Sequence, residues 1–187
     1  MSHPTRQGPL SLMETTWFAL HTRHQHETKV TKILNNKGFE TFLPMYQATK
    51  RWSDRLKSLW LPLFPGYVFV AKIEDRRLEI LNTHGVAAIV STAGVPSTIS
   101  EHEINVIRQL VKDARKVEPH SYLRVGDEVR LGSGPLAGTN GFLVRKKDCY
   151  RLVVCVEILG RAASVEIYAS DLDASYIPRR ESELHVS

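Results

Sequence analysis

The chain has 187 residues, and 42% of them are hydrophobic. This length suits one domain or two small ones, and this composition favours a packed core over wholesale disorder. No apolar run approaches membrane-spanning length and no signal-peptide pattern opens the chain, so we expect no membrane partner. The formal net charge is +5: residues 1–116 contain 16 Lys and Arg against 10 Asp and Glu, whereas residues 117–187 contain 9 against 10. The basic excess in the first part favours an anionic partner such as nucleic acid.

Strands and helices alternate in the first part of the chain. After a polar leader over residues 1–13, apolar residues recur with the spacing of strands or of amphipathic helices. We expect these elements, in chain order, at residues 17–21 (strand), 25–37 (helix), 39–43 (strand), 67–72 (strand), 75–83 (short helix, with Leu78 and Leu81 facing inward) and 87–91 (strand). A capping box, in which Ser100 and Glu103 satisfy each other's orphan N–H groups, opens a last helix. The order β-α-β, β-α-β, α predicts an α/β sandwich with the helices packed on a small sheet.

The stretch LPLFPGYVFV, residues 61–70, combines an interruption with a strand. Pro62 and Pro65 donate no N–H group to a sheet ladder, whereas the residues after Gly66 are aromatic or β-branched. Tyr67 and Phe69 alternate with two valines, so this strand has two apolar faces. One face can enter a core, and the other needs a cover from its own chain or from a partner.

The stretch from Lys50 to Lys57 is basic, with four Lys and Arg residues against Asp54 alone, and it also contains Trp52. We expect a long hairpin or a mobile loop here. The basic excess of residues 1–116 as a whole also fits ordinary solubility charge, and charge alone does not separate this interpretation from an anionic partner.

The hydrophobic pattern of the sequence changes after a short linker at residues 117–122. Helical periodicity ends, and short β-branched runs alternate with glycine turns. We expect five strands, at residues 129–131, 141–146, 152–158, 163–168 and near Tyr176. Close-spaced strands of this kind predict a small β-barrel over residues 123–178, followed by a charged tail at residues 179–187.

The histidine and cysteine residues do not form the pattern of an active site or of a metal site. His21 and His24 would point to opposite faces of a strand, so we expect no metal site there. Cys149 and Cys155 are six residues apart, a spacing that fits neither a metal site nor a disulfide framework, and both sit in an apolar strand pattern. Reduced thiols favour the cytoplasm. Since no phosphate loop, oxyanion loop or paired-carboxylate motif is present, we expect a binding protein without a cofactor.

Several motifs resemble one known family. WFALHTR, GFETFLP, PLFPGYVFV and THGVAAIV resemble the N-terminal (NGN) domain of NusG-type transcription elongation factors. VGDEVRLGSGPLAGTNGFLV and RLVVCVEILGRAASVEIYASDL resemble their KOW domain. RWSDRLKSLW, just before the PLFPGYVF motif, resembles the specialised paralogues of the RfaH and UpxY type, which act on long polysaccharide operons. The resemblance implies an α+β fold, with an NGN sandwich at residues 14–116 and an SH3-like five-stranded KOW barrel, and a monomer.

The resemblance also implies a function. We expect a factor that binds RNA polymerase through its N-terminal domain and modulates pausing or termination, as an operon-specific antiterminator. In this family the tip of the clamp helices of the largest polymerase subunit docks on the aromatic strand. The residues implied here are Phe64, Tyr67 and Phe69. Arg76 and Arg77 lie where the family touches the opposite pincer of the polymerase.

Two further surfaces are implied by alignment with the family. Upstream or non-template DNA would contact Arg23, Lys29, Thr83 and His84. The KOW domain would contact a small-subunit ribosomal protein or Rho through Ile158, Leu159 and Arg161. Leu159 replaces the usual aromatic residue, which favours the ribosome over Rho, and we expect Ile158 and Leu159 to form an exposed apolar pair.

Two alternatives remain open at this point. An RNA-binding module of the RRM type would share the β-α-β-β-α-β order and would stack bases on aromatic residues of the first strand and of GYVFV. In RfaH, the second domain folds as helices over the aromatic pocket. Here the run from Leu152 to Val156 is β-branched, and Gly160 would interrupt a helix. We therefore expect a stable barrel and an aromatic pocket that is open in the free protein.

Overall fold

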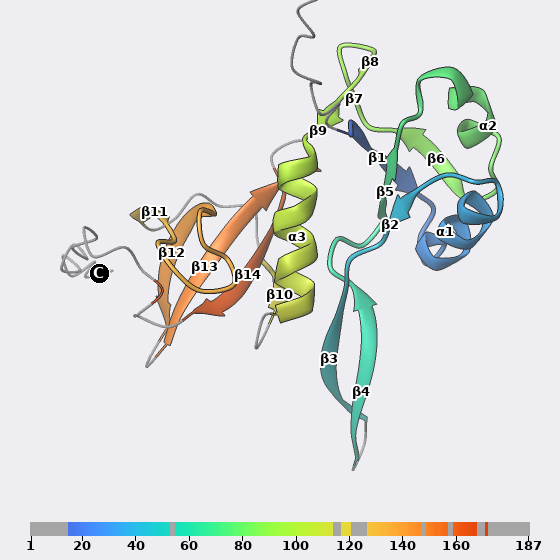
Figure 1. Ribbon diagram of the computed structural model, residues 1–187. Helices are drawn as coiled ribbons and strands as arrows, with labels where there is room; N and C mark the ends of the chain where they lie inside the picture. The colour runs from blue at the N-terminus through green and yellow to red at the C-terminus, as the bar shows by residue number, and fades with distance from the viewer. Residues whose placement is uncertain are drawn as a thin grey trace, which may run out of the picture.

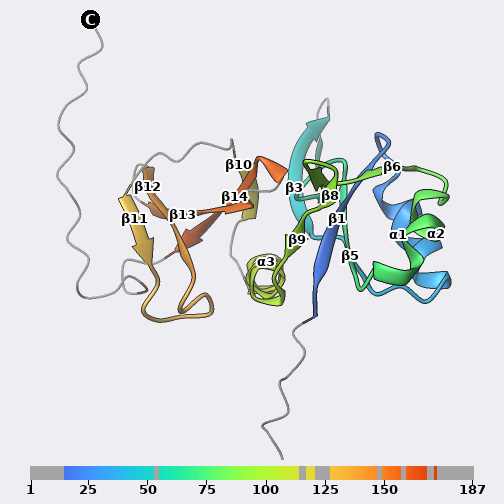
Figure 2. The same ribbon diagram turned by 90° about the horizontal axis from the view of Figure 1, so that it is seen from above.

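The computed structural model describes residues 15–52, 55–113, 117–120, 127–146, 149–156, 159–167 and 171. Two β-sheets form the framework, and one long helix, α3 (Glu101–Asp113), lies between them (Figures 1 and 2). The N-terminal sheet carries two more helices on its outer face. No helix among the described residues is long and apolar enough to cross a membrane.

The N-terminal sheet is antiparallel and centres on two neighbouring strands, β1 (Trp17–Thr22) and β5 (Tyr67–Ala71). Their edges pair with β2 (Thr41–Phe42), β6 (Val86–Ile89) and β9 (Thr98–Ile99). The strand order is β2-β5-β1-β6, with β9 on the first residues of β1. Both central strands are buried on both faces, as expected for the apolar alternation of β5.

One face of this sheet is covered by α1 (Glu27–Asn36) and α2 (Arg77–Leu81), which follows a 3-10 turn at Glu74–Arg76 (Figure 1). The core on this side contains alternate residues of the two central strands together with residues of both helices. Its fully or nearly fully buried members include Phe18, Leu20, Val30, Leu34, Val68, Val70 and Ile80. Leu78, which we expected to face inward, is 74% exposed. Residues two apart lie on nearly opposite sides of a helix, so α2 presents Ile80 to the core and leaves Leu78 on the outer side.

The other face of the sheet packs against α3. The other set of alternate residues, Trp17, Ala19, Phe69 and Ala71, shares a cluster with Ile104, Ile107 and Leu110 of the helix. The predicted capping box is present: the Ser100 hydroxyl accepts from the Glu103 backbone N–H at 3.2 Å, and the Ser100 backbone N–H donates to the Glu103 carboxylate at 3.0 Å.

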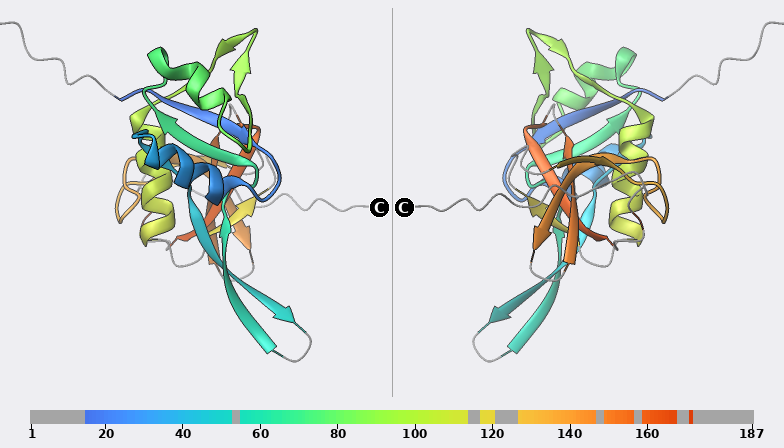
Figure 3. Two further views of the ribbon diagram at one scale, coloured as in Figure 1. Left: turned by 90° about the vertical axis from the view of Figure 1, so that its right-hand side faces the viewer. Right: turned by 90° about the vertical axis from the view of Figure 1, so that its left-hand side faces the viewer.

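Two hairpins extend from this domain. The long one consists of β3 (Met45–Trp52) and β4 (Arg55–Pro62), which pair only with each other and project away from the rest of the molecule (Figures 1 and 3). The basic stretch therefore lies in a long hairpin, as expected. The short one consists of β7 (Ser91–Thr92) and β8 (Val95–Pro96), joined by Ala93 and Gly94, both at positive φ.

The C-terminal domain is a five-stranded antiparallel sheet. Its strands lie in the order β10-β14-β13-β12-β11. Their bounds are β10 (Val117–His120), β11 (Asp127–Arg130), β12 (Asn140–Lys146), β13 (Cys149–Val156) and β14 (Arg161–Ile167). The β-branched run of β13 is strand, as expected, and the α+β fold class is confirmed.

One boundary in this part of the chain differs from the expectation. Val117–His120, which we assigned to the linker, forms edge strand β10. Val117 is buried there, and Pro119 is tolerated because an edge strand has a side that needs no ladder donor. The strand expected near Tyr176, the leader and the tail lie outside the described residues.

The capping box generates the first prediction. Replacing Ser100 with Ala removes the acceptor for the Glu103 N–H and should reduce the free energy of unfolding by about 1 kcal/mol. Urea denaturation followed by circular dichroism measures this loss. Ser58→Ala is the matched control, because Ser58 is an exposed serine on β4 outside any helix cap. Equal stabilities of the Ser100 and Ser58 variants would contradict the capping role.

Candidate functional site

The aromatic residues of the FPGYVF stretch come together on the α3 side of the N-terminal sheet. Phe69 lies edge-on to Phe64 and stacks on Phe42, with ring centroids 6.1 Å apart in both pairs. Phe69 is completely buried and Phe64 is only 2% exposed, so these two rings belong to the core. Our expectation that they stand exposed for a partner is wrong for this arrangement of the chain. Their role as polymerase contacts stays a prediction.

Local geometry fixes this aromatic turn. Gly66 has φ +85°, a left-handed conformation that suits glycine, and its N–H donates to the Glu27 carboxylate at 2.7 Å. Its carbonyl accepts from the Thr22 N–H at 2.8 Å. Glu27 is itself buried at the start of α1, where the positive end of the helix dipole favours a carboxylate. The sequence analysis missed Glu27, because nothing in its neighbourhood signals a partner thirty-nine residues away.

Tyr67 is the member of this strand that remains partly accessible. Its ring lies 5.4 Å from the ring of His21 and under the guanidinium of Arg161, which is 6.0 Å from the ring centroid. Arg161 belongs to β14, so a side chain of the C-terminal domain stands over the aromatic strand of the N-terminal domain.

The C-terminal domain also contacts α3 directly. Val106 and Ile107 of the helix and Val154 and Val156 of β13 line a shared cavity of about 200 Å³. The cavity has a polar part as well, formed by His102, Glu103, Thr139 and Asn140. Buried residues of both domains belong to one continuous hydrophobic cluster. The expectation of an open aromatic pocket is therefore wrong, because α3 and the C-terminal sheet cover that face.

A second contact lies at the base of the long hairpin. Strand β3 touches β10, and burial together with the nearby Glu118 carboxylate raises the pKa of the Tyr46 phenol. Glu118 in turn accepts from the Arg151 guanidinium at 2.8 Å, and Glu166 accepts from it at 3.0 Å. The hydrogen bond to Glu118 contributes most to holding the pKa of Arg151 above its ordinary value. Arg151 is nearly buried, and sequence analysis missed it because three strands must assemble before its partners meet.

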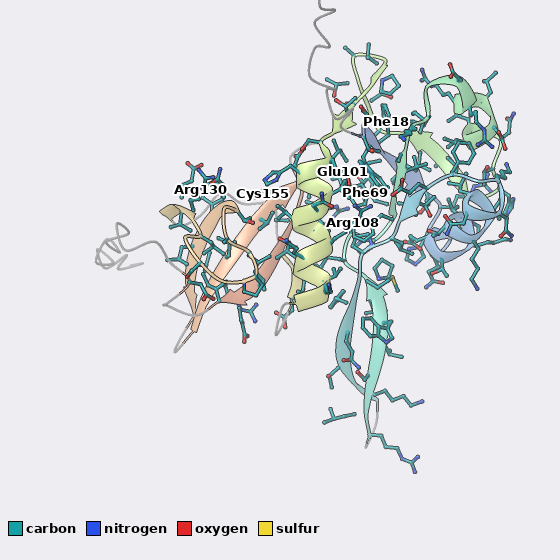
Figure 4. All side chains as sticks on the ribbon, in the orientation of Figure 1. Phe18, Phe69, Glu101, Arg108, Arg130 and Cys155 are labelled. Carbon is teal, nitrogen blue, oxygen red and sulfur yellow. The ribbon has the colours of Figure 1, made fainter. Side chains whose placement is uncertain are left out.

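Helix α3 is held to the sheet by a polar cluster as well as by its apolar face. The indole N–H of Trp17 donates to Glu101, and Arg108 donates to the same carboxylate at 2.9 Å. The Arg108 guanidinium also lies 4.9 Å from the centroid of the Trp17 ring. Figure 4 shows Glu101 and Arg108 on α3 beside Phe69, with Cys155 on the C-terminal sheet.

The two arginines expected at the opposite pincer differ from each other. Arg76 lies 3.9 Å from the centroid of the Phe39 ring, forms an ion pair with Glu79 at 2.9 Å and donates to the Lys37 carbonyl at 2.7 Å. It is therefore occupied within its own domain. Arg77 is exposed and lies next to the exposed Leu78. Of the two, Arg77 is the side chain that can reach a partner without breaking the internal bonds that Arg76 makes.

The residues that we expected to contact DNA also differ from one another in their accessibility. Arg23 and His84 sit on adjacent turns, because the Arg23 N–H donates to the Gly85 carbonyl at 2.8 Å and the rings of His26 and His84 are 5.5 Å apart. Arg23, His84 and Lys29 are all exposed.

Thr83, in contrast, is 3% exposed. Its hydroxyl donates to the Glu79 carbonyl at 2.9 Å and accepts from the Lys37 ammonium at 2.8 Å. The expectation that Thr83 contacts DNA is therefore wrong, because its side chain closes the end of α2.

The expected KOW partner site is only partly described. Leu159 is 7% exposed and belongs to the large hydrophobic cluster, so the expected exposed apolar pair is wrong for this residue. Gly160, at φ +56°, turns the chain immediately afterwards and directs Leu159 into the core. Arg161 is exposed, and Ile158 lies outside the described residues.

No group of three or more His, Cys, Asp and Glu residues within the described ranges could hold a metal ion. Cys155 lies at the edge of the α3 cavity, and the side chain of Cys149 lies outside the described part.

Comparison with known proteins decides the family. The family described as "Transcription termination factor nusG" has a model that matches residues 15–108, which is half of the chain. The chain belongs to the NusG family. The match spans the sheet, both outer helices, the long hairpin and most of α3.

Curated relatives agree with this assignment. The "Transcription termination/antitermination protein NusG" of Staphylococcus epidermidis is 29% identical over 167 residues, which cover 81% of this chain and 91% of the relative. The proteins of the same name from Staphylococcus carnosus and Staphylococcus aureus are 28% and 29% identical over the same length. A solved structure titled "Domain interaction in Thermotoga maritima NusG" has the same fold, with a TM-score of 0.56 at 22% identity over 88% of this chain and 99% of that one.

The RRM alternative conflicts with the burial of the aromatic residues. An RRM stacks bases on exposed aromatic rings of its sheet. Trp17 and Phe69 are fully buried here, and Phe18 is 6% exposed. The sheet therefore has no open face on which bases could stack on these rings.

The turn that carries His84 generates the second prediction. Gly85 has φ +99°, and an added Cβ would lie 2.9 Å from the Val30 side chain and 3.1 Å from Nδ1 of His26. Gly85→Ala should therefore cost more than the about 1–2 kcal/mol of a left-handed residue alone, and should displace His84 from Arg23. Thermal unfolding and backbone chemical shifts of Arg23 measure both effects.

Gly38→Ala is the matched control for this prediction. Gly38 also has a positive φ, at +80°, but a Cβ there would meet nothing within 4 Å. It should lose stability from backbone strain only. If the two variants unfold at the same temperature, the close contact between Gly85 and α1 contributes nothing.

Proposed function

We propose that the chain binds RNA polymerase through the aromatic face of its N-terminal domain and modulates pausing or termination. The observation that carries this proposal is the position of Tyr67. It is partly accessible at the rim of a buried aromatic cluster, inside the part of the chain that matches the NusG family. Tyrosine is a frequent anchor in protein interfaces, because it contributes a large apolar area and a polar end.

Docking on this face requires the C-terminal domain to move aside. Arg161 of the C-terminal domain stands over Tyr67, whereas Phe64 and Phe69 are buried in the cluster that also contains the apolar residues of α3. The cover is imperfectly packed, with a cavity of about 200 Å³ that has polar groups in its wall. This space is open to solvent on one side, so α3 and the C-terminal sheet are not in close-packed contact along it. The apparent affinity for polymerase would then be the intrinsic affinity reduced by the fraction of molecules in the open arrangement.

The finer assignment follows from the motifs in the long hairpin. The RWSDRLKSLW stretch supports an operon-specific antiterminator of the RfaH and UpxY type, which acts in the cytoplasm as a monomer and not as an enzyme. The C-terminal domain, once released from α3, would be available to a small-subunit ribosomal protein. Rho is the less favoured partner, because Leu159 replaces the usual aromatic residue.

The third prediction tests whether the contact between the C-terminal domain and α3 limits polymerase docking. Val154→Asp places a charge in the apolar wall between β13 and α3 and should increase affinity for a fragment that contains the polymerase clamp helices, because it favours the open arrangement. Arg161→Ala, a surface change, should increase that affinity by a smaller amount. Arg130→Ala, an exposed arginine of the same domain, is the control and should change nothing. Circular dichroism checks that each variant keeps its strands.

Tyr67→Ala in the Val154→Asp background separates docking from opening. Loss of an interface anchor should lower the affinity about tenfold or more. If the double variant binds as tightly as Val154→Asp, docking does not use this strand. If Val154→Asp binds no better than the wild type, the closed arrangement does not limit docking.

The fourth prediction concerns the basic turns. We propose that Arg23, Lys29 and His84 contact upstream or non-template DNA in the elongation complex. Arg23→Ala combined with Lys29→Ala should weaken recruitment to a paused complex and lower its salt dependence, because two cations that neutralise phosphates are removed. Binding to the isolated clamp-helix fragment should not change. An unchanged salt slope would exclude these residues as DNA contacts.

A further inference from the structure

The outer edge of strand β4 is long, exposed and rich in apolar side chains. Strands β3 and β4 pair only with each other and project from the molecule (Figures 1 and 3). Residues 55–60 of β4 are all exposed. Five large apolar side chains are exposed among the described residues, and three of them lie in this stretch, namely Leu56, Leu59 and Trp60. The open edge of such a ribbon is a template on which another strand can form.

Pro62 shows how the hairpin uses its backbone groups. It pairs with Met45, but it has no N–H, so these two residues cannot form a hydrogen-bonded pair of the antiparallel ladder. The neighbouring pair supplies the bond instead, since the Leu63 N–H donates to the Pro44 carbonyl at 2.8 Å. Pro62 is tolerated because its missing N–H would point away from β3.

The same alternation continues along β4 and fixes which backbone groups face its outer edge. Hydrogen-bonded and non-hydrogen-bonded pairs alternate in an antiparallel ladder, and residues of the second kind direct their N–H and C=O groups away from the partner strand. Counting back from Pro62 in steps of two, the residues of this kind are Leu56, Ser58 and Trp60. No strand in the described part of the chain pairs with their N–H and C=O groups.

The charge of the hairpin determines which kind of strand fits this edge. Residues 45–62 contain four Lys and Arg residues and only one acid, Asp54. Basic residues on an edge oppose pairing with a second copy of the same strand, because like charges would come together. An acidic strand would instead be attracted by these charges. The charge therefore favours an acidic partner over a second copy of this chain.

An added strand would use both faces of the ribbon at once. Directly paired side chains lie on the same face, and neighbours along a strand alternate between faces. Residues opposite Leu56 and Trp60 would contact apolar side chains on one face. Residues opposite Arg55 and Lys57 would meet basic side chains on the other face. The indole and the cations can thus contact one strand although they lie on opposite faces.

We propose that the outer edge of β4 binds an acidic, extended segment of a partner protein as an additional antiparallel strand. The segment would place apolar residues opposite Leu56 and Trp60, and glutamate or aspartate opposite Arg55 and Lys57. In this mode of recognition the backbone hydrogen bonds provide affinity and the alternate side chains provide specificity. The edge is separate from Tyr67, and the proposal does not depend on polymerase docking.

The test uses the full chain and a dye-labelled peptide, followed by fluorescence anisotropy. The peptide has the core valine, isoleucine, threonine, glutamate, valine, glutamate, so that its glutamates lie opposite Lys57 and Arg55 when the threonine pairs with Ser58. N-methylation of the two valines and the threonine removes the N–H groups that face β4 and should weaken binding at least about tenfold. N-methylation of the isoleucine and the glutamates changes the other edge of the peptide and should have little effect.

Amide hydrogen exchange gives a second readout that needs no variant. In the unbound chain, the amides of Leu56, Ser58 and Trp60 should exchange faster than those of Lys57 and Leu59, which donate to β3. The peptide should slow the exchange of the first three amides. Fast exchange of these three amides in the presence of saturating peptide would contradict the added strand.

Variants of the hairpin test the edge from the side of the protein. Ser58→Pro removes an outward N–H and, like Pro62, leaves the bonds between β3 and β4 in place, so it should weaken binding about tenfold. Thr49→Pro is the matched control, because Thr49 pairs with Ser58 and its N–H points to the opposite edge of the hairpin. Arg55→Glu should weaken binding of the peptide and strengthen binding of a peptide whose last glutamate is lysine. Amide chemical shifts of Leu59 verify that each variant keeps the hairpin.

Four outcomes would overturn the proposal. These are no binding of the peptide at low salt, equal affinities of the two methylated peptides, equal affinities of the Ser58→Pro and Thr49→Pro variants, and binding that responds to Arg55→Glu but not to Ser58→Pro. The last is the behaviour of an anion, nucleic acid included, that is held by charge alone. Dimerisation that Ser58→Pro abolishes, without peptide binding, would assign the edge to a second copy instead. Failure of polymerase docking through Tyr67 would not affect these readouts.

Discussion

The packing of α3 against the second apolar face of β1 and β5 is the interaction that connects the two halves of the molecule. Ile104, Ile107 and Leu110 fill the space beside Trp17 and Phe69, and the ion pair between Arg108 and Glu101 fixes the helix over the indole. Because the helix is held on that side, Val106 and the cavity beside it are presented to the C-terminal sheet. Without α3 in this position, the aromatic face would be open and the C-terminal sheet would lose its contacts with Val106 and Ile107.

This arrangement makes the apolar strand β5 serve two purposes. Its Val68 and Val70 build a permanent core with α1 and α2, whereas Phe69 takes part in a cluster that includes a separate domain. Separating two domains that share a hydrophobic cluster exposes apolar surface to water, which is unfavourable. A partner that covers the same surface offsets this unfavourable free energy. The stability of the closed form then sets how strongly a partner must bind.

Local patterns in the sequence predicted most of the elements. The alternation in β5, the helical spacing of α1 and the Ser100 capping box all depend on residues within a few positions of each other, and all three appear in the structure. The α+β class followed from their order. The contacts that decide accessibility depend on distant residues and were missed: Thr83 is closed off by Lys37, Leu159 packs into the shared cluster, and Arg161 reaches Tyr67 from the other domain. No local spacing records such contacts, because they exist only after two sheets and α3 have assembled.

The most direct measurement of the account is an interdomain distance in the free full-length chain, obtained from nuclear Overhauser effects between methyl groups. Val106 and Ile107 on α3 and Val154 and Val156 on β13 line one cavity, so their methyl groups should give cross-peaks between the domains. Addition of a clamp-helix fragment should remove these cross-peaks while those within each domain persist. Absence of cross-peaks between α3 and β13 in the free chain, with both domains folded, would contradict the covered aromatic face.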